Sequence, residues 1–136
     1  MATKPYPVTY KGRSIGIVVL TVAQIFIGLI HVFSGLLLLG SELAVNSQAT
    51  IAYDIYTLIF GVLVLLFAVL IWKGKKLGWA GTIAVSFFVI AADGLTLLNL
   101  PSIPGIPKLP AYTEIAYSFF VIVYLLLGHV RRKFLQ

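Results

Sequence analysis

The sequence predicts an all-α membrane protein with four transmembrane helices, and three observations lead to that prediction. First, 60% of the 136 residues are apolar and only 10% are charged, whereas a soluble domain carries about 25% charged residues. Second, the apolar residues form long stretches, and a bilayer core of roughly 30 Å needs about 20 of them per helix. Third, nine of the ten basic residues lie next to those ends of the stretches that would share one side of a membrane. A single membrane domain over residues 1–136 is therefore expected.

The four expected helices cover residues 15–40, 51–72, 77–100 and 111–130, and none of these ranges contains a proline. Continuous helices are expected because lipid offers no partner for a broken backbone hydrogen bond. Short connections between the helices favour an antiparallel up-down bundle. The first stretch is far longer than the apolar core of a signal peptide, about 7–15 residues, and is therefore expected to remain in the protein as a helix.

The basic residues predict the orientation of this bundle. Juxtamembrane lysine and arginine stay on the cytoplasmic side of a membrane, so both termini are expected in the cytoplasm and the protein in the cell membrane. The net charge of +6 is attributed to this topology and to anionic lipid headgroups at the inner face, not to nucleic acid. The bases that set the orientation are Lys4, Lys11, Arg13, Lys73, Lys75, Lys76, Arg131, Arg132 and Lys133.

The turn between the second and third expected helices is the most distinctive inner segment. Two interfacial tryptophans, Trp72 and Trp79, bracket three lysines and two glycines, an arrangement typical of a membrane interface. Together with residues 28–35 and 129–133, this turn resembles a recurring module of small archaeal and bacterial four-span membrane proteins. In that module an apolar helix ends in a Trp-Lys-Gly-Lys-type turn. The resemblance implies a four-span topology and no particular activity.

Prolines recur at every third residue in the outer loop expected at 101–110. Polyproline II has three residues per turn and a rise of about 3.1 Å, so this loop is predicted to form a rod roughly 28 Å long. One interpretation lays the rod flat across the outer end of its own bundle. The other makes it a docking edge for a partner protein, because a preformed rod loses little entropy on binding. The candidate docking residues are Pro101, Ile103, Pro104, Ile106, Pro107, Leu109 and Pro110.

Polar residues inside membrane spans are costly, and they mark the first place to look for a site. In the first, third and fourth spans such residues recur at helical spacing, so each span carries them on one face. These faces are expected to meet inside the bundle, where hydrogen bonds between helices contribute about 0.6–2 kcal/mol each. The predicted polar seam consists of Thr21, Gln24, His31, Ser86, Asp93, Thr96, Tyr117 and Tyr124.

His31 and Asp93 are the ionisable members of this seam. Their expected depths differ by only about 3 Å, which permits a contact, although the first and third helices are diagonal in an up-down bundle. His31 is open to three interpretations: a neutral histidine in a packing seam, a haem or metal ligand, or part of a proton or ion pathway with Asp93. It is the only candidate for binding a cofactor, because His129 is expected roughly 14 Å deeper. No metal or cofactor is predicted.

The sequence shows no catalytic signature, and no catalytic residue is predicted. It lacks a Gly-rich phosphate loop, a nucleophile elbow and a His-Glu-x-x-His motif. With no cysteine, disulfides and thiolate metal sites are excluded. Glu42, Asp54 and Glu114 are interpreted as solvated charges near the outer ends, with a divalent-cation site as the alternative.

Size and short loops favour a non-catalytic function. The leading hypothesis is an accessory or structural subunit of a larger membrane complex, or a homo-oligomer, because so small a bundle has little interior for a substrate cavity. The alternative is a small proton or ion transporter, or a redox-cofactor subunit carrying haem or quinone, that uses His31 and Asp93. The expected partners are the lipid bilayer and other membrane subunits or a second copy. An enzyme is not favoured.

Overall fold

The computed structural model describes residues 9–10, 13–45 and 51–136. Its elements are, in order, β1 (Thr9–Tyr10), β2 (Arg13–Ser14), α1 (Ile15–Ala44), α2 (Ile51–Trp72), α3 (Lys76–Leu97), α4 (Lys108–Leu126) and α5 (Gly128–Phe134). Four helices in these described ranges, α1 to α4, are long and apolar enough to cross a membrane. The prediction of a helical protein with four such helices is confirmed. The predicted inner bases Lys4 and Lys11 lie outside the described residues.

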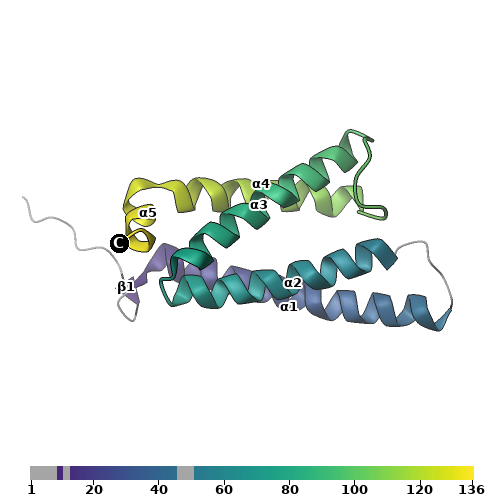
Figure 1. Cartoon of the computed structure of the whole chain (residues 1–136), viewed down its shortest axis with the longest axis horizontal. Helices are drawn as coiled ribbons and strands as arrows, with labels where there is room; N and C mark the ends of the chain where they lie inside the picture. Colours follow the sequence, from purple (N-terminus) through teal and green to yellow (C-terminus); the bar gives the residue numbers. More distant parts are fainter. Residues whose placement is uncertain (1–8, 11–12, 46–50) are drawn as a thin grey trace, which may run out of the picture.

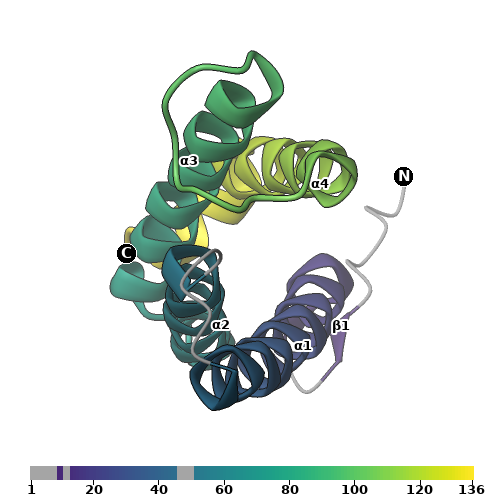
Figure 2. The same ribbon diagram turned by 90° about the vertical axis from the view of Figure 1, so that its right-hand side faces the viewer.

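The helices pack in the order of the chain, α1 on α2, α2 on α3 and α3 on α4. Figure 1 shows that the α1–α2 and α3–α4 hairpins lie close together near α5 and β1 and separate toward their other ends. Viewed along the bundle in Figure 2, α1 and α4 flank an open side. We call the end where Arg13, Lys73 and Lys133 meet the basic end, and the opposite end, where α1 finishes after Glu42, the acidic end.

Glycines bring α1 and α2 into close contact. A Cβ atom added to Gly61 of α2 would lie 2.7 Å from the backbone nitrogen of Val32 in α1. One added to Gly28 of α1 would lie 2.7 Å from Leu65 Cγ in α2. Because lipid is as apolar as a leucine side chain, helices in a membrane associate through such close van der Waals contact and not through the hydrophobic effect.

The main apolar core lies at the basic end. A tight turn joins α2 to α3, and Gly74 supplies its positive φ of 69°, which glycine adopts without steric cost. After the turn, Trp79 Nε1 donates to the carbonyl oxygen of Leu125 at 2.9 Å and ties α3 to α4. The core residues come from α1, α2, α4 and α5 and are Ile17, Leu20, Ile71, Val121, Leu125, Val130 and Phe134.

The prediction that the fourth helix continues to residue 130 is wrong. Leu127 has an extended backbone with ψ 133°, and α5 turns across the basic end in Figure 1. This break allows Val130 and Phe134 to be buried in the core, while the bases at 131–133 stay exposed. In a straight helix these apolar side chains would lie beyond the end of the bundle and stay exposed. Burial of Val130 and Phe134 therefore favours the break in the helix.

The predicted polyproline rod over residues 101–110 is also wrong. Gly105 has a φ of 92°, which belongs to a turn, and residues 108–110 already form the first turn of α4. Pro110 fits there because amides in the first turn need no helical partner. Ser102 Oγ donates to the carbonyl oxygen of Ala92 at 2.7 Å, so the loop folds back onto α3. The remaining boundaries differ less: α1 continues from residue 40 to 44, and α3 ends at 97 instead of 100.

Candidate functional site

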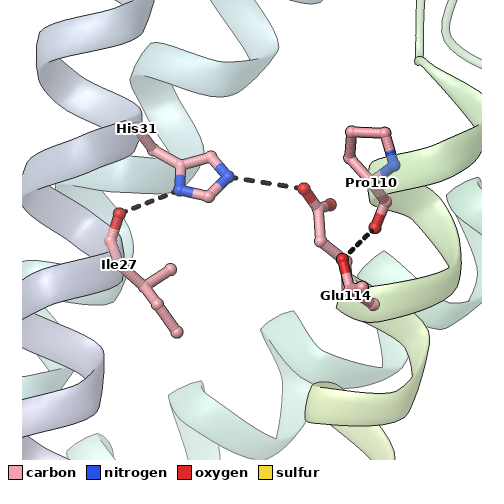
Figure 3. A network of polar contacts seen from close by, with 5 residues as sticks. Ile27, His31, Pro110 and Glu114 are labelled. Atoms are coloured by element: carbon pink, nitrogen blue, oxygen red, sulfur yellow. Dashed lines mark hydrogen bonds and ion pairs between the residues drawn. The ribbon is translucent and has the colours of Figure 1, made fainter.

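His31 in α1 faces α4 across the open side of the bundle. Its Nδ1 donates to the carbonyl oxygen of Ile27, one turn earlier, at 2.8 Å. Its Nε2 lies 3.6 Å from Oε1 of Glu114 in α4, as Figure 3 shows. With Nδ1 held by a carbonyl, Nε2 is the ring atom free to gain or lose a proton. Uptake of a proton there would turn this contact into an ion pair.

Asp93 in α3 lies beside this pair and is completely buried, with 0% of its surface exposed. Neither of its carboxyl oxygens makes a hydrogen bond of standard geometry with a described residue, and Glu114 is the side chain that approaches it. Glu114 and His31 are the charged groups that act on it electrostatically. We call His31, Asp93 and Glu114 the ionisable cluster. Three helices contribute to it, and it contains two carboxyl groups and one imidazole, of which Glu114 and His31 are in contact.

Tyr56 adds a contribution from α2. Its hydroxyl group is buried and has no hydrogen-bond partner among the described residues, and both carboxyl groups of the ionisable cluster act on it electrostatically. The Tyr56 ring lies 6.2 Å from that of Phe60, which meets the His31 ring edge-on at 4.8 Å. These rings form an apolar wall of the ionisable cluster on its α2 side.

A second polar site lies deeper in the bundle. Gln24 Nε2 in α1 donates to Thr82 Oγ1 in α3 at 3.2 Å, so these two helices do meet across the bundle. Beside this bond is a cavity of about 20 Å³, and a single water requires about 10–15 Å³. Two of its polar atoms, Gln24 Oε1 and the Tyr117 hydroxyl, have no partner among the described residues. Its polar lining residues are Gln24, Thr82, Ser86, Tyr117 and Ser118.

The remaining residues of the predicted seam are spread along the bundle. Thr21 is buried, and its hydroxyl group has no described partner. Thr96 instead donates to the carbonyl oxygen of Ala92 in its own helix, at 3.0 Å. Tyr124 lies at the basic end against Gly16, where an added Cβ would be 2.1 Å from the tyrosine hydroxyl. The structure thus brings the predicted residues of α1, α3 and α4 together at two depths rather than in one cluster.

The predicted docking loop does not form a single exposed edge. Ser102, Ile103 and Pro104 line an apolar groove of about 810 Å³ between α2, α3 and the loop. Leu109 is 80% exposed, but it belongs to the first turn of α4. Residues 102–104 therefore fit the interpretation in which the loop lies against its own bundle.

The geometry around His31 bears on the metal and haem interpretations. Among residues 9–10, 13–45 and 51–136, no group of three His, Cys, Asp or Glu side chains is placed to hold a metal ion. A haem iron or metal at His31 Nε2 would have to displace Glu114, because Nδ1 already bonds Ile27. His129 begins α5 at the basic end, so the two histidines are not paired. An imidazole and carboxyl groups are side chains that can exchange protons.

Glu114 is the site residue that the predicted seam omits. Its spacing puts it on the polar face of the fourth span, and it is also counted among the charges near the outer ends; in the structure it lies in α4 about 9 Å beyond the start of the helix, pairs with His31 and remains 25% exposed. Asp54, also counted among the outer charges, is buried in the first turn of α2. The sequence does contain a signal for Glu114, because it begins a stripe at steps of four, three and four whose other members are buried: Ser118, Val121 and Leu125.

Comparison of the chain with protein families, with curated proteins and with solved structures gave no match. The resemblance to the small four-span module therefore stays a prediction. Function has to be inferred from the chemistry of the ionisable cluster and from the way the helices enclose it.

Proposed function

We propose that this chain is a four-span protein of the cell membrane that transports protons by way of the ionisable cluster. The observation that carries the proposal is Asp93, a fully buried carboxyl group beside Glu114 whose oxygens make no hydrogen bond of standard geometry with a described residue. A structural polar group at that depth is expected to be hydrogen-bonded. Ionisable residues within membrane spans mark proton relays in pumps and transporters.

The charges of the ionisable cluster explain how it would hold a proton. One imidazolium can neutralise only one carboxylate, so a second carboxylate would leave an uncompensated negative charge. Such a charge is very costly away from water, and the group takes up a proton instead. The neutral state therefore holds His31 charged against one carboxylate, with the other carboxyl group protonated. Loss or gain of that proton is the exchange step.

The polar groups between the ionisable cluster and the basic end supply a route for the proton. Below His31 lie the cavity at Gln24 and then Thr21, both with oxygen atoms that lack described partners. Waters bonded to these atoms would connect them. In the present conformation the apolar core around Ile17 and Leu20 closes the route at the basic end. Transport therefore requires the helices to separate there, as in other alternating-access proteins.

The placement of charges supports an orientation for this transporter. The bases of β2, the α2–α3 turn and α5 meet at one end of the bundle, and lysine and arginine near spans remain cytoplasmic. We therefore assign the basic end, and with it both ends of the chain, to the cytoplasm. The ionisable cluster then lies nearer the outer face, from which protons would enter.

Proteoliposomes with an imposed pH gradient test the proposal. The wild-type protein is expected to dissipate the gradient faster than empty liposomes do, and Asp93→Asn to abolish that difference because an amide cannot carry the proton. Glu42→Gln is the matched control, since it removes a carboxyl group outside the ionisable cluster, and it should retain the wild-type rate. Unchanged transport by Asp93→Asn, or no transport by wild type, would contradict the proposal.

A second candidate is an accessory subunit or a homo-oligomer, and the open side between α1 and α4 favours it. His31 and Glu114 remain 18% and 25% exposed there. An ionisable pair facing hydrocarbon is costly, and a helix from another subunit would cover it. Native mass spectrometry of protein extracted in mild detergent should then show an oligomer or a second chain. A clean monomer would count against this candidate.

A further inference from the structure

A pocket of about 500 Å³ opens at the basic end, remote from the ionisable cluster. Its walls come from three segments that are far apart in the sequence: the start of α1 with β2, the α2–α3 turn, and α5. Each segment contributes one cationic side chain, namely Arg13, Lys73 and Lys133. The volume is within the range of about 300–1,000 Å³ that is typical of small-molecule sites.

Arg13 is held in place by two contacts with the end of α2. Its Nε donates to the carbonyl oxygen of Trp72 at 2.5 Å. Its guanidinium group lies 4.4 Å from the centroid of the Trp72 ring, an arrangement favoured by the negative face of the aromatic ring. The β1–β2 pairing of Tyr10 with Arg13 fixes the backbone from the other side. The arginine is thus preorganised, which lowers the entropic cost of binding a ligand.

The lining of the pocket specifies an anion with an apolar portion. No aspartate or glutamate is among the residues that line it; its uncharged polar residues are Gln136 and Ser14, and the Ser14 hydroxyl lacks a hydrogen-bond partner among the described residues. Arginine, lysine and a hydroxyl donor together match the oxygens of a phosphate group. Ile17, Ile71 and Phe134 supply apolar wall beside these donors. A soluble anion would not need that wall, whereas the glycerol and upper acyl carbons of a phospholipid would contact it.

We propose that this pocket binds the phosphate headgroup of one anionic phospholipid. Its position at the end of the membrane-spanning helices places it at headgroup depth, and basic pockets of this kind between transmembrane helices hold anionic lipids. A bound lipid would join α5 to the α2–α3 turn and to the β1–β2 strand pair. The basic end would then be held closed by the lipid as well as by the apolar core. The inference does not rest on the proposal of proton transport.

Native mass spectrometry of the full chain with added phosphatidylglycerol tests the site. Lys73→Gln combined with Lys133→Gln removes two charges from the pocket. Lys75→Gln combined with Lys76→Gln removes two charges from the same end, at residues that do not line the pocket. Wild type should retain one phosphatidylglycerol molecule in preference to phosphatidylcholine. The pocket variant should bind it roughly tenfold or more weakly than the control variant, because charge-assisted hydrogen bonds are lost.

Competition with inorganic phosphate distinguishes a phospholipid headgroup from a soluble phosphate as the ligand of the pocket. If the pocket recognises a lipid, a large excess of phosphate should leave the bound phosphatidylglycerol in place. Displacement by phosphate would overturn the lipid assignment in favour of a soluble phosphate site. If both double variants lost the lipid equally, the proposed site would be contradicted, because the lipid would then be attracted by the overall positive charge of the basic end and not by the pocket. A wild-type protein without any bound lipid would overturn it as well.

Discussion

At the scale of single residues, Asp93 and Asp54 are both buried, and both carboxyl oxygens of Asp93 but only one of Asp54 lack a well-formed hydrogen bond among the described residues. Sequence reasoning selected both His31 and Asp93, because ionisable residues within apolar spans stand out against their neighbours. It could not select their arrangement. Which carboxyl group faces His31 depends on the rotation of α4 about its axis, and packing, not local sequence, sets that rotation. The predicted seam consequently lacks Glu114, although its spacing puts it on the polar face of the fourth span.

The His31–Glu114 contact predicts an energetic coupling between the two residues. In a double-mutant cycle with His31→Leu and Glu114→Leu, measured by reversible unfolding in mixed detergent micelles, we expect about 1 kcal/mol of interaction free energy, as polar contacts between membrane helices contribute. The pair His129→Leu and Glu114→Leu is the control and should give additive effects, because His129 lies at the basic end. Additivity in the first cycle would show that the contact has no energetic role.

At the scale of elements, the sequence predicted helices well and their ends less well. The second helix was predicted with the observed boundaries, 51–72, because charged and glycine residues follow an unbroken apolar run. Two other segments misled the prediction for a shared reason. The prediction of a polyproline rod from the three-residue repeat did not consider that Pro110 can occupy the first turn of a helix. The apolar residues near 130 gave no sign that α4 breaks at Leu127. Both outcomes depend on packing against distant segments.

Close packing of α1 on α2 predicts opposite effects for two glycine substitutions. Gly61→Ala should destabilise the protein by about 1–3 kcal/mol, because its Cβ would lie 2.7 Å from the Val32 backbone nitrogen and overpacking costs that much. Gly40→Ala is the control. Its Cβ meets no atom within 4 Å, so the higher helix propensity of alanine should leave stability unchanged or raise it by up to about 1 kcal/mol. Unfolding in mixed micelles measures both. Equal stability of the two variants would contradict the packing.

At the scale of the whole molecule, the two ends of the bundle have different properties. The basic end is closed by an apolar core and a cationic pocket, whereas the hairpins separate toward the acidic end in Figure 1. Four spans and the grouping of bases were predictable, because lipid constrains length, polarity and charge so strongly. The separation of the hairpins was not, since a simple up-down bundle would keep all four helices in contact.

Proton transport by this protein requires His31, Asp93 and Glu114 to meet inside the membrane and to hold a proton there. Solid-state NMR of isotope-labelled protein in lipid bilayers can observe this arrangement, with His129→Gln leaving His31 as the single histidine. We expect a through-space cross-peak between the His31 ring and the Glu114 carboxyl carbon, and a protonated Asp93 carboxyl group at neutral pH. A spectrum with no such cross-peak, in which Asp93 is ionised throughout the neutral range, would show that the three residues do not form a proton-binding cluster.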